Sequence, residues 1–307
     1  MIVVTGGAGF IGSALARRLL RSDDVVVFDN FSSGSPANFP ESKQLKAIRG
    51  DIRNAASLNR ALRGADCDCV YHFAADPDVR GCTAHPRESF AVNVLGTLNV
   101  LEACRKNDVL RVVFASSSVV YGDAARIPTP EIAPLEPISV YGASKAAGEA
   151  YCAAFAETYG VRCVALRYAN IFGPPSTHGV MRDFVNRLKK NPKQLKILGD
   201  GLQSKSYLYI DDALDATLLA ERKSKRRFDA FNVSSQKKTT VKEIARLVSA
   251  SLGVNPKYSF TGGKRGWAGD VRVMLLDTRK LRALGWREKT TLRDGVRKYV
   301  SWLARKS

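Results

Sequence analysis

The sequence has few residues that could hold a metal ion. Its 307 residues include only three histidines and six cysteines, and no two cysteines form a Cys-x-x-Cys pair. Because structural zinc sites take four such ligands, usually in closely spaced pairs, we expect no bound metal. The cysteines are expected to be buried free thiols in a reducing compartment. They are Cys67, Cys69, Cys82, Cys104, Cys152 and Cys163.

Long apolar runs are also missing. No run approaches the roughly 20 residues that are needed to cross a bilayer, so no membrane partner is expected. Met1 leads directly into Ile2–Thr5 and a glycine-rich turn, without the basic leader of a secretory signal. We therefore expect a cytoplasmic protein.

Acidic residues are scarce relative to basic ones. The chain has 29 Asp and Glu against 48 Lys and Arg, which gives a formal net charge of +19. Such an excess is compatible with nucleic-acid binding, with attraction of an anionic small substrate, or with solubility alone. The densest basic run, 222–227, has no interleaved aromatic residues that would stack on bases. We favour a solvated surface that also steers a diphosphate substrate, and we expect no nucleic-acid partner.

The first half of the chain alternates short β-branched apolar segments with segments of helical periodicity. This alternation predicts an α/β fold with a Rossmann-type, doubly wound parallel sheet. Strands are expected at 2–5, 25–28, 68–73, 111–115 and 162–167, and helices at 10–20, 54–63, 86–106 and 142–159.

The pattern changes after Tyr168, where prolines and glycines divide the chain into shorter pieces. We expect a smaller α+β domain here, with a strand near 206–210. The predicted domains are 1–168 and 169–307, with an approximate boundary that the chain can cross back over. Helices of the second domain are expected at 180–190, 211–222, 240–252 and 290–304.

A glycine-rich turn joins the first strand to the first helix. Gly6, Gly9 and Gly12 recur every third residue within Thr5–Gly12. Glycines at this spacing allow a tight turn, bring backbone amides close to a pyrophosphate, and let the helix pack on the strand. The helix N-terminus then faces the negative charge. The strand before the turn and the helix after it make this a dinucleotide-binding prediction.

Asp29 ends the second strand, 17 residues after Gly12. A carboxylate there can accept hydrogen bonds from the adenosine ribose hydroxyls and would repel a 2′-phosphate, so NAD is favoured over NADP. The alternative is that Asp29 only holds the turn that follows it. Asp51 and Ile52 follow a further short strand, just before the helix expected at 54–63, and are expected to flank the adenine.

Tyr141 and Lys145 lie four residues apart at the start of a predicted helix, so their side chains share one face. A tyrosine with a pKa near 10 is a poor base, but an adjacent ammonium and a positive nicotinamide would stabilise its phenolate. The pair could then accept a proton from a substrate hydroxyl. Ser116–Ser118 follow a strand expected to end in the same crevice. The alternative is an ordinary amphipathic helix beside a hydroxyl-rich turn.

Together these segments resemble the extended short-chain dehydrogenase/reductase family, and within it UDP-glucose 4-epimerases of the shorter archaeal type. The likeness extends over nearly the whole chain. The segments that carry it are Thr5–Gly12, Asp29–Asn30, Phe73–Ala75, Ser116–Gly122, Tyr141–Lys145, Arg167–Pro174 and Arg265–Asp270.

The resemblance implies a role for individual residues. Ser117 and Tyr141 would contact the reacting hydroxyl, and Lys145 would bind the nicotinamide ribose and tune Tyr141. The NAD site would comprise Gly6, Gly9, Phe10, Ile11, Gly12, Asp29, Asn30, Phe31, Ser32, Ser33, Gly34, Asp51, Ile52, Phe73, Ala74, Ala75, Asn93, Ser116, Tyr141, Lys145 and Tyr168. The nucleotide-sugar site would comprise Ser117, Ser118, Tyr141, Asn170, His178, Val180, Lys205, Arg265 and Asp270.

The reaction type depends on two positions. Relatives that eliminate water carry an Asp-Glu pair where this chain has Ser118 and Val119. Without a carboxylate there, elimination lacks its acid–base catalyst, and 4-epimerisation of UDP-glucose and UDP-galactose through a 4-keto sugar is the leading hypothesis. Other nucleotide sugars stay open, including UDP-glucuronate, N-acetylhexosamines and the substrate of a 2-epimerase. A non-catalytic NAD-binding regulator or RNA-binding protein is the less favoured alternative.

A homodimer is also expected. The predicted helices 86–106 and 142–159 carry more apolar residues than packing on the sheet should need, and related enzymes pair two such helices from each subunit. The alternative is that these helices only cover the sheet. The apolar residues are Val94, Leu98, Leu101, Tyr151, Cys152 and Phe155.

Overall fold

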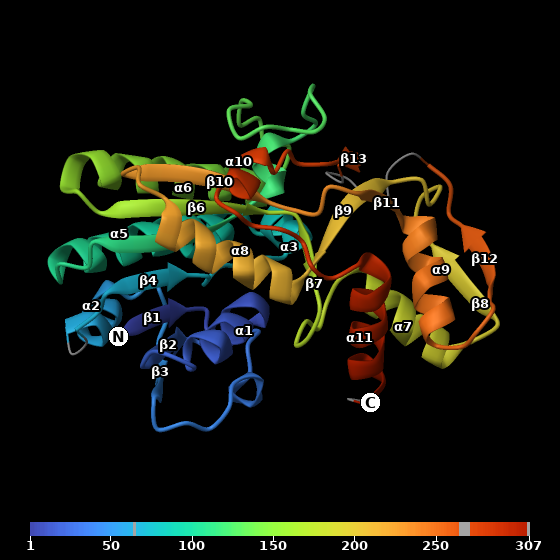
Figure 1. Cartoon of the computed structure of the whole chain (residues 1–307), viewed down its shortest axis with the longest axis horizontal. Coiled ribbons are helices and arrows are strands. Elements are labelled where there is room, and N and C mark those ends of the chain that lie inside the picture. Colours follow the sequence, from blue (N-terminus) through green and yellow to red (C-terminus); the bar gives the residue numbers. More distant parts are fainter. Residues whose placement is uncertain (64–65, 264–270, 306–307) are drawn as a thin grey trace. The chain divides into compact units, whose positions relative to one another are not determined.

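The computed structural model of the protein describes residues 1–63, 66–263 and 271–305. Within them the chain forms two compact units (Figure 1). The first comprises Met1–Gly122, Pro134–Arg167 and Thr217–Phe231, so the chain returns to it late in the sequence. The second comprises Asp123–Ala133, Tyr168–Ala216 and Asn232–Ser307.

A seven-stranded parallel sheet forms the centre of the first unit, with the order β10-β6-β5-β4-β1-β2-β3. The predicted Rossmann-type fold is therefore confirmed. Its strands are β1 (Ile2–Thr5), β2 (Val25–Asp29), β3 (Leu45–Arg49), β4 (Cys69–His72), β5 (Arg111–Ser117), β6 (Arg162–Tyr168) and β10 (Phe228–Val233).

The strand order reverses between β1 and β4, which pair with Thr5 opposite His72. In open α/β sheets, ligands bind outside the carboxyl ends of the strands at such a switch point. The glycine-rich turn follows Thr5, and the segment Phe73–Ala75 follows His72. The order of the strands therefore brings both segments to the edge where a dinucleotide would bind.

Helices connect these strands. One run expected to be a single helix, 86–106, contains a π-helical segment over Phe90–Leu95 between α4 and α5. Single π-helical turns are frequent at functional sites. The helices are α1 (Phe10–Leu19), α2 (Ala55–Arg63), α3 (Val79–Ala84), α4 (Pro86–Ser89), α5 (Gly96–Lys106) and α6 (Val140–Tyr159), with short 3-10 turns at Pro36–Asn38 and Ser118–Tyr121.

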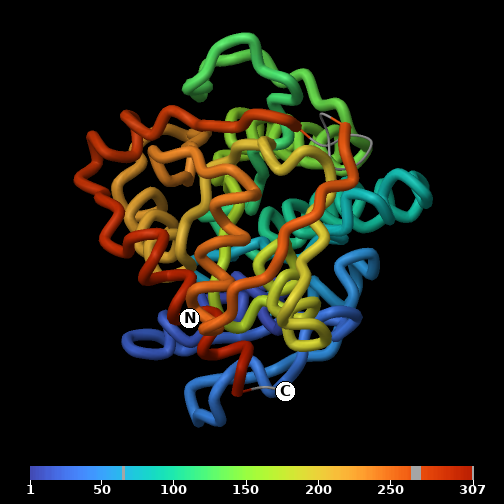
Figure 2. The backbone as a smooth tube through the Cα atoms, turned by 90° about the vertical axis from the view of Figure 1, so that its right-hand side faces the viewer, coloured from blue at the N-terminus to red at the C-terminus, as the bar shows by residue number. Residues whose placement is uncertain are grey.

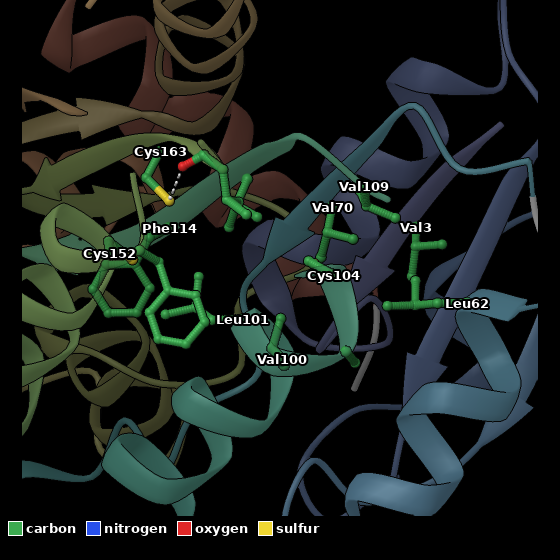
Figure 3. Close-up of a cluster of buried hydrophobic side chains, with 14 of the residues drawn as sticks. Val3, Leu62, Val70, Val100, Leu101, Cys104, Val109, Phe114, Cys152 and Cys163 are labelled. Atoms are coloured by element: carbon green, nitrogen blue, oxygen red, sulfur yellow. Dashed lines mark hydrogen bonds between the residues drawn. The ribbon is translucent and has the colours of Figure 1, made fainter. Parts of the chain in front are cut away.

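The core of the first unit lies between the sheet and its helices (Figure 3). Cys104, Cys152 and Cys163 are fully buried in it, and all six cysteines are free thiols. Leu101 and Phe155, which we assigned to a dimer surface, are 0% and 5% exposed and belong to this core.

That assignment of the apolar residues was therefore wrong for most of them. Cys152 and Val94 are buried too, Leu98 is half-buried, and Tyr151 alone of the six is exposed. The reason is that α5 and α6 also pack against each other, so a wider stripe of each helix is covered than packing on the sheet alone would require.

The second unit has its own sheet, in which β9 is central. β11 and β13 flank β9, and β7 also pairs with it; a separate pair joins β12 to β8. The strands are β7 (Asn170–Phe172), β8 (Gln194–Ile197), β9 (Ser204–Tyr209), β11 (Lys238–Thr240), β12 (Lys257–Phe260) and β13 (Val273–Met274).

Three helices of the second unit lie side by side: α7 (Val180–Lys190), α9 (Val241–Ser251) and α11 (Leu292–Arg305), as Figures 1 and 2 show. A capping box between Thr240 and Glu243 starts α9. α10 spans Arg279–Ala283, and α8 (Ile210–Lys223) leads from the second unit back into the first. Among the residues that the structure describes, no helix is long and apolar enough to cross a membrane.

Candidate active site

The glycine-rich turn is packed so tightly that a side chain does not fit at Gly6 or at Gly12. A Cβ on Gly6, whose φ is +67°, would lie 2.5 Å from the backbone nitrogen of Ala74, and one on Gly12 would overlap the carbonyl oxygen of Gly6. α1 begins directly after Gly9, and no side chain caps its N-terminus. The positive end of this helix can therefore stabilise an anionic group such as a pyrophosphate.

Asp29 connects the turn to the loop after β2. It is 7% exposed, its Oδ2 accepts from the backbone N–H of Ala8 at 2.9 Å, and its Oδ1 accepts from that of Phe31 at 2.7 Å. Asp29 therefore does hold the turn, as the alternative interpretation of the sequence proposed. A carboxylate has about four lone-pair positions, so these two bonds leave acceptor capacity for ribose hydroxyls.

The loop after Asp29 has a backbone suited to a ligand-binding segment. Phe31 has a φ of 59°, in the left-handed region that non-glycine residues rarely adopt and that often occurs at ligand-binding sites. The Asn30 amide donates to the Asp51 carboxylate at 3.1 Å, which joins the ends of β2 and β3. Ser32 and Ser33 are exposed, whereas Gly34 lies against Ala8 of the glycine-rich turn.

Asn93 lies in the π-helical segment and is buried. Its Oδ1 accepts from the backbone N–H of Asp76 at 2.8 Å, and its Nδ2 donates to the Asp76 carbonyl and to Ser144 Oγ, both at 3.1 Å. These bonds join the segment after β4 to α6. Asn93 thereby positions Phe73–Ala75 relative to the helix that carries Tyr141.

Tyr141 and Lys145 lie in the first two turns of α6, which Ser139 caps by accepting from the backbone N–H of Gly142. Lys145 is 3% exposed, and its Nζ lies 5.0 Å from the ring centroid of Phe114 and 5.8 Å from that of Tyr141. Burial lowers the pKa of Lys145 to about 8, so the side chain is still an ammonium ion at neutral pH.

Burial raises the pKa of Tyr141 above its usual value, and a hydrogen bond with Ser117 acts in the opposite direction. The phenol is therefore protonated at neutral pH in the protein without ligands. Additional positive charge beside the ring would be needed to make it a base. The structure brings Ser117, Tyr141 and Lys145 together, as the sequence predicted, but their catalytic roles stay predictions.

Ser116 and Ser118 differ from Ser117. The hydroxyl of Ser116, predicted to line the cofactor site, donates to Glu149 inside the protein. Ser118 is 6% exposed and begins the 3-10 turn. Only Ser117 of the three is partly exposed, which favours it as the hydroxyl that meets a substrate.

In the second unit the structure brings two predicted substrate residues together. Asn170 of β7 and Lys205 of β9 lie on adjacent strands, and the Asn170 amide donates to the Ser206 carbonyl at 2.9 Å. Tyr168 is buried at the end of β6. His178 is exposed in the segment that precedes α7, and Val180 is the first residue of that helix. Arg265 and Asp270 lie outside the described residues.

Sequence reasoning missed a buried ion pair next to the catalytic candidates. Glu149 follows Lys145 by one helical turn, and Arg167 is near the end of β6. Both are charged residues inside otherwise apolar segments, and that signal could have identified them. In the described part of the chain, no group of three or more His, Cys, Asp or Glu side chains could hold a metal ion.

The sheet order, the glycine-rich turn and the Tyr-x-x-x-Lys helix are those expected of an extended short-chain dehydrogenase/reductase. Comparison with known proteins agrees, since residues 2–234 match the family described as the NAD dependent epimerase/dehydratase family. The chain belongs to this family, which confirms the resemblance stated from its sequence.

Relatives match along the whole chain. A UDP-glucose 4-epimerase of Mycolicibacterium smegmatis is 33% identical over 315 residues, covering 99% of both chains. A crystal structure of a UDP-galactose 4-epimerase is 44% identical, with a TM-score of 0.89 and 99% of both chains covered. The UDP-glucose 4-epimerase of Thermus thermophilus in complex with NAD is 35% identical, with a TM-score of 0.90, covering 99% of this chain and 98% of that one.

Proposed function

We propose that this protein is an NAD-dependent UDP-sugar 4-epimerase that interconverts UDP-glucose and UDP-galactose. One observation carries the proposal: Ser117, Tyr141 and Lys145 lie together, while Ser118 and Val119 occupy the positions where water-eliminating relatives carry carboxylates. The groups for oxidising a hydroxyl are present, and the groups for elimination are absent.

The residues of the first unit fit NAD. The pyrophosphate would lie at the uncapped N-terminus of α1, beside Gly9. Asp29 would accept from the adenosine ribose, and Lys145 would contact the nicotinamide ribose. The carboxylate of Asp29 disfavours a 2′-phosphate, which supports NAD over NADP.

The chemistry follows from the acid–base groups. Bound NAD supplies the acceptor, and later the donor, of the hydride at C4 of the sugar. Tyr141 removes the proton of the 4-hydroxyl and returns it to the 4-keto oxygen after the sugar has turned over. Lys145 and the positively charged nicotinamide stabilise the phenolate, and Ser117 orients the reacting oxygen.

Elimination needs a base for C5 and an acid for the leaving hydroxyl. Ser118 and Val119 can provide neither. A serine hydroxyl does not ionise near neutral pH, and valine has no polar group. The 4-keto sugar is therefore expected to be reduced again. The hydride taken from C4 would be returned to C4, so the reaction would cause no net redox change.

The nucleotide sugar is proposed to bind through the second unit. Asn170 and Lys205 would contact it, with Lys205 in the position where many relatives place an arginine on the diphosphate. Other nucleotide sugars remain the alternative, and the net charge of +19 is compatible with UDP-glucuronate among them.

The test is to incubate the purified protein with UDP-glucose, UDP-galactose, UDP-N-acetylglucosamine and UDP-glucuronate and to identify the products by NMR. Conversion of UDP-galactose to UDP-glucose without added reductant supports the proposal. If only another nucleotide sugar were epimerised, the proposed substrate would be wrong but the proposed reaction would stand. A 4-keto-6-deoxy product would contradict the proposed reaction.

We also propose a homodimer, on a set of residues that keeps only Tyr151 of those first expected. Phe90, Leu95 and Tyr151 are 59%, 41% and 40% exposed and lie on the α4–α5 run and on α6. Large apolar side chains exposed on neighbouring helices are characteristic of an interface. A cytoplasmic location stays a prediction.

A further inference from the structure

A buried ion pair lies beneath the candidate catalytic groups. Arg167 binds the carboxylate of Glu149 through Nε, at 2.9 and 3.1 Å, and through Nη2, at 2.6 Å. The two side chains are 6% and 3% exposed. Arg–carboxylate pairs with two parallel N–H donors have the most strongly directional geometry among ion pairs.

The pair connects every element that carries a catalytic candidate. Glu149 accepts from Ser116, the residue before Ser117 on β5. Arg167 donates to the hydroxyl of Tyr121 at 2.6 Å, at the end of the 3-10 turn that follows Ser117. Glu149 also belongs to α6, the helix of Tyr141 and Lys145.

The connection runs along one side of α6. Tyr141, Lys145 and Glu149 follow one another at intervals of four residues, so their side chains project from neighbouring turns. Ser116 is fixed to the last of these and Ser117 bonds to the first. The spacing between strand β5 and helix α6 is therefore set at two points. One is the hydrogen bond from Ser116 to Glu149, and the other is the hydrogen bond between Ser117 and Tyr141.

We propose that Glu149 and Arg167 are positioning residues that fix Ser117 at the end of β5 against Tyr141 on α6. Neither touches the reacting atoms in this proposal. Because Arg167 neutralises Glu149, the carboxylate can lie one helical turn from Lys145 without adding net negative charge near the lysine. This inference rests on the proposed epimerase function.

Stability alone is a weak explanation for this arrangement. A buried ion pair can often be replaced by apolar residues of similar volume without loss of stability, whereas removing one partner leaves an uncompensated charge. This difference provides the test. Replacing both residues should preserve stability, but it removes the anchor for Ser116.

The experiment uses the double variant E149M/R167M, the single variant S116A and the control E221M. Glu221 pairs with Arg111 at 2.9 Å and with Arg162 at 3.1 Å, at the opposite ends of β5 and β6. For each full-length protein, kcat, KM, melting temperature and bound NAD content are measured with the epimerised sugar.

For E149M/R167M we expect a melting temperature and NAD content close to the parent's, KM within about threefold, and kcat lower by about 10- to 100-fold, the range expected for a small misplacement of reacting groups. S116A keeps the ion pair and should show the same split with a smaller fall in kcat. E221M should melt earlier and keep the parental kcat.

Parental kcat in E149M/R167M would overturn the proposal. If the double variant does not fold, S116A decides, since parental turnover there would show that the anchor is unnecessary. An equal fall of kcat in E221M would reduce the effect to general destabilisation. If the unsubstituted protein epimerised no sugar, the proposed function would be overturned, and this inference with it. The assay of the unsubstituted protein distinguishes that outcome from a failure of the inference alone.

Discussion

Replacing His72 with glutamine should make the first unit less sensitive to acid. The imidazole is 1% exposed at the end of β4, between Thr5 and Thr97. Thr97 donates its hydroxyl proton to the Asn93 carbonyl at 2.6 Å, so it must accept from His72 Nε2. His72 Nδ1 is left to accept from Thr5, and the ring is held neutral.

Burial, and to a smaller extent the positive charge of Lys145, lowers the pKa of His72 to about 3. In the unfolded chain the pKa is about 6.5. Between pH 7 and pH 5 the unfolded chain therefore gains a proton that the folded chain does not take up. The contribution to stability is fully present above pH 6.5 and falls with pH, by about 2 kcal/mol between pH 7 and pH 5.

The assay is urea unfolding of the parent and His72→Gln at both pH values, with hydrogen exchange of β1 and β4 to identify the transition of the first unit. Other titrating groups cancel when the two pH differences are subtracted. Glutamine can keep the donor to Thr97, so the variant should fold, less stably at pH 7 by about 1–2 kcal/mol. If both proteins lost the same stability between pH 7 and pH 5, the neutral buried imidazole would be refuted.

Three further predictions concern the cofactor, the proposed interface and Lys145. Asp29→Ala should weaken NAD binding by about 1.5–3 kcal/mol in calorimetry, because charge-assisted hydrogen bonds are lost; unchanged affinity would restrict Asp29 to the turn. Light scattering should give a dimer that Phe90→Glu with Tyr151→Glu dissociates, and a monomeric parent at micromolar concentration would reject the interface. Lys145→Met should lower turnover and NAD affinity at pH 7. Its deficit in turnover should narrow above pH 8, where the parent's lysine loses its charge; a ratio constant from pH 6 to 10 would argue against an electrostatic role.

The sequence predicted those parts of the fold that local patterns determine. Buried parallel strands are continuous apolar runs, so β1, β2, β4, β5 and β6 were found within two residues of their ends. The turn at Gly6–Gly12 was predictable because its geometry requires glycine.

Features that depend on distant contacts were not predictable. The π-helical segment that presents Asn93 has no pattern of its own in the sequence. Leu101 and Phe155 were mistaken for interface residues because periodicity does not reveal how many neighbours a helix has. Glu149 and Arg167 could each have been noticed as charged residues within apolar segments, but their pairing depends on a helix and a strand meeting at one place, which the local sequence does not determine.

The central claim is that Tyr141 is the acid–base group of an NAD-dependent epimerase. The most direct measurement is the turnover of UDP-galactose by Tyr141→Phe, with Ser117→Ala as the comparison and NAD content as the control. We predict a loss of about 10²- to 10⁴-fold for Tyr141→Phe, a smaller loss for Ser117→Ala, and cofactor retained in both. Near-parental turnover by Tyr141→Phe, with NAD bound, would contradict the account.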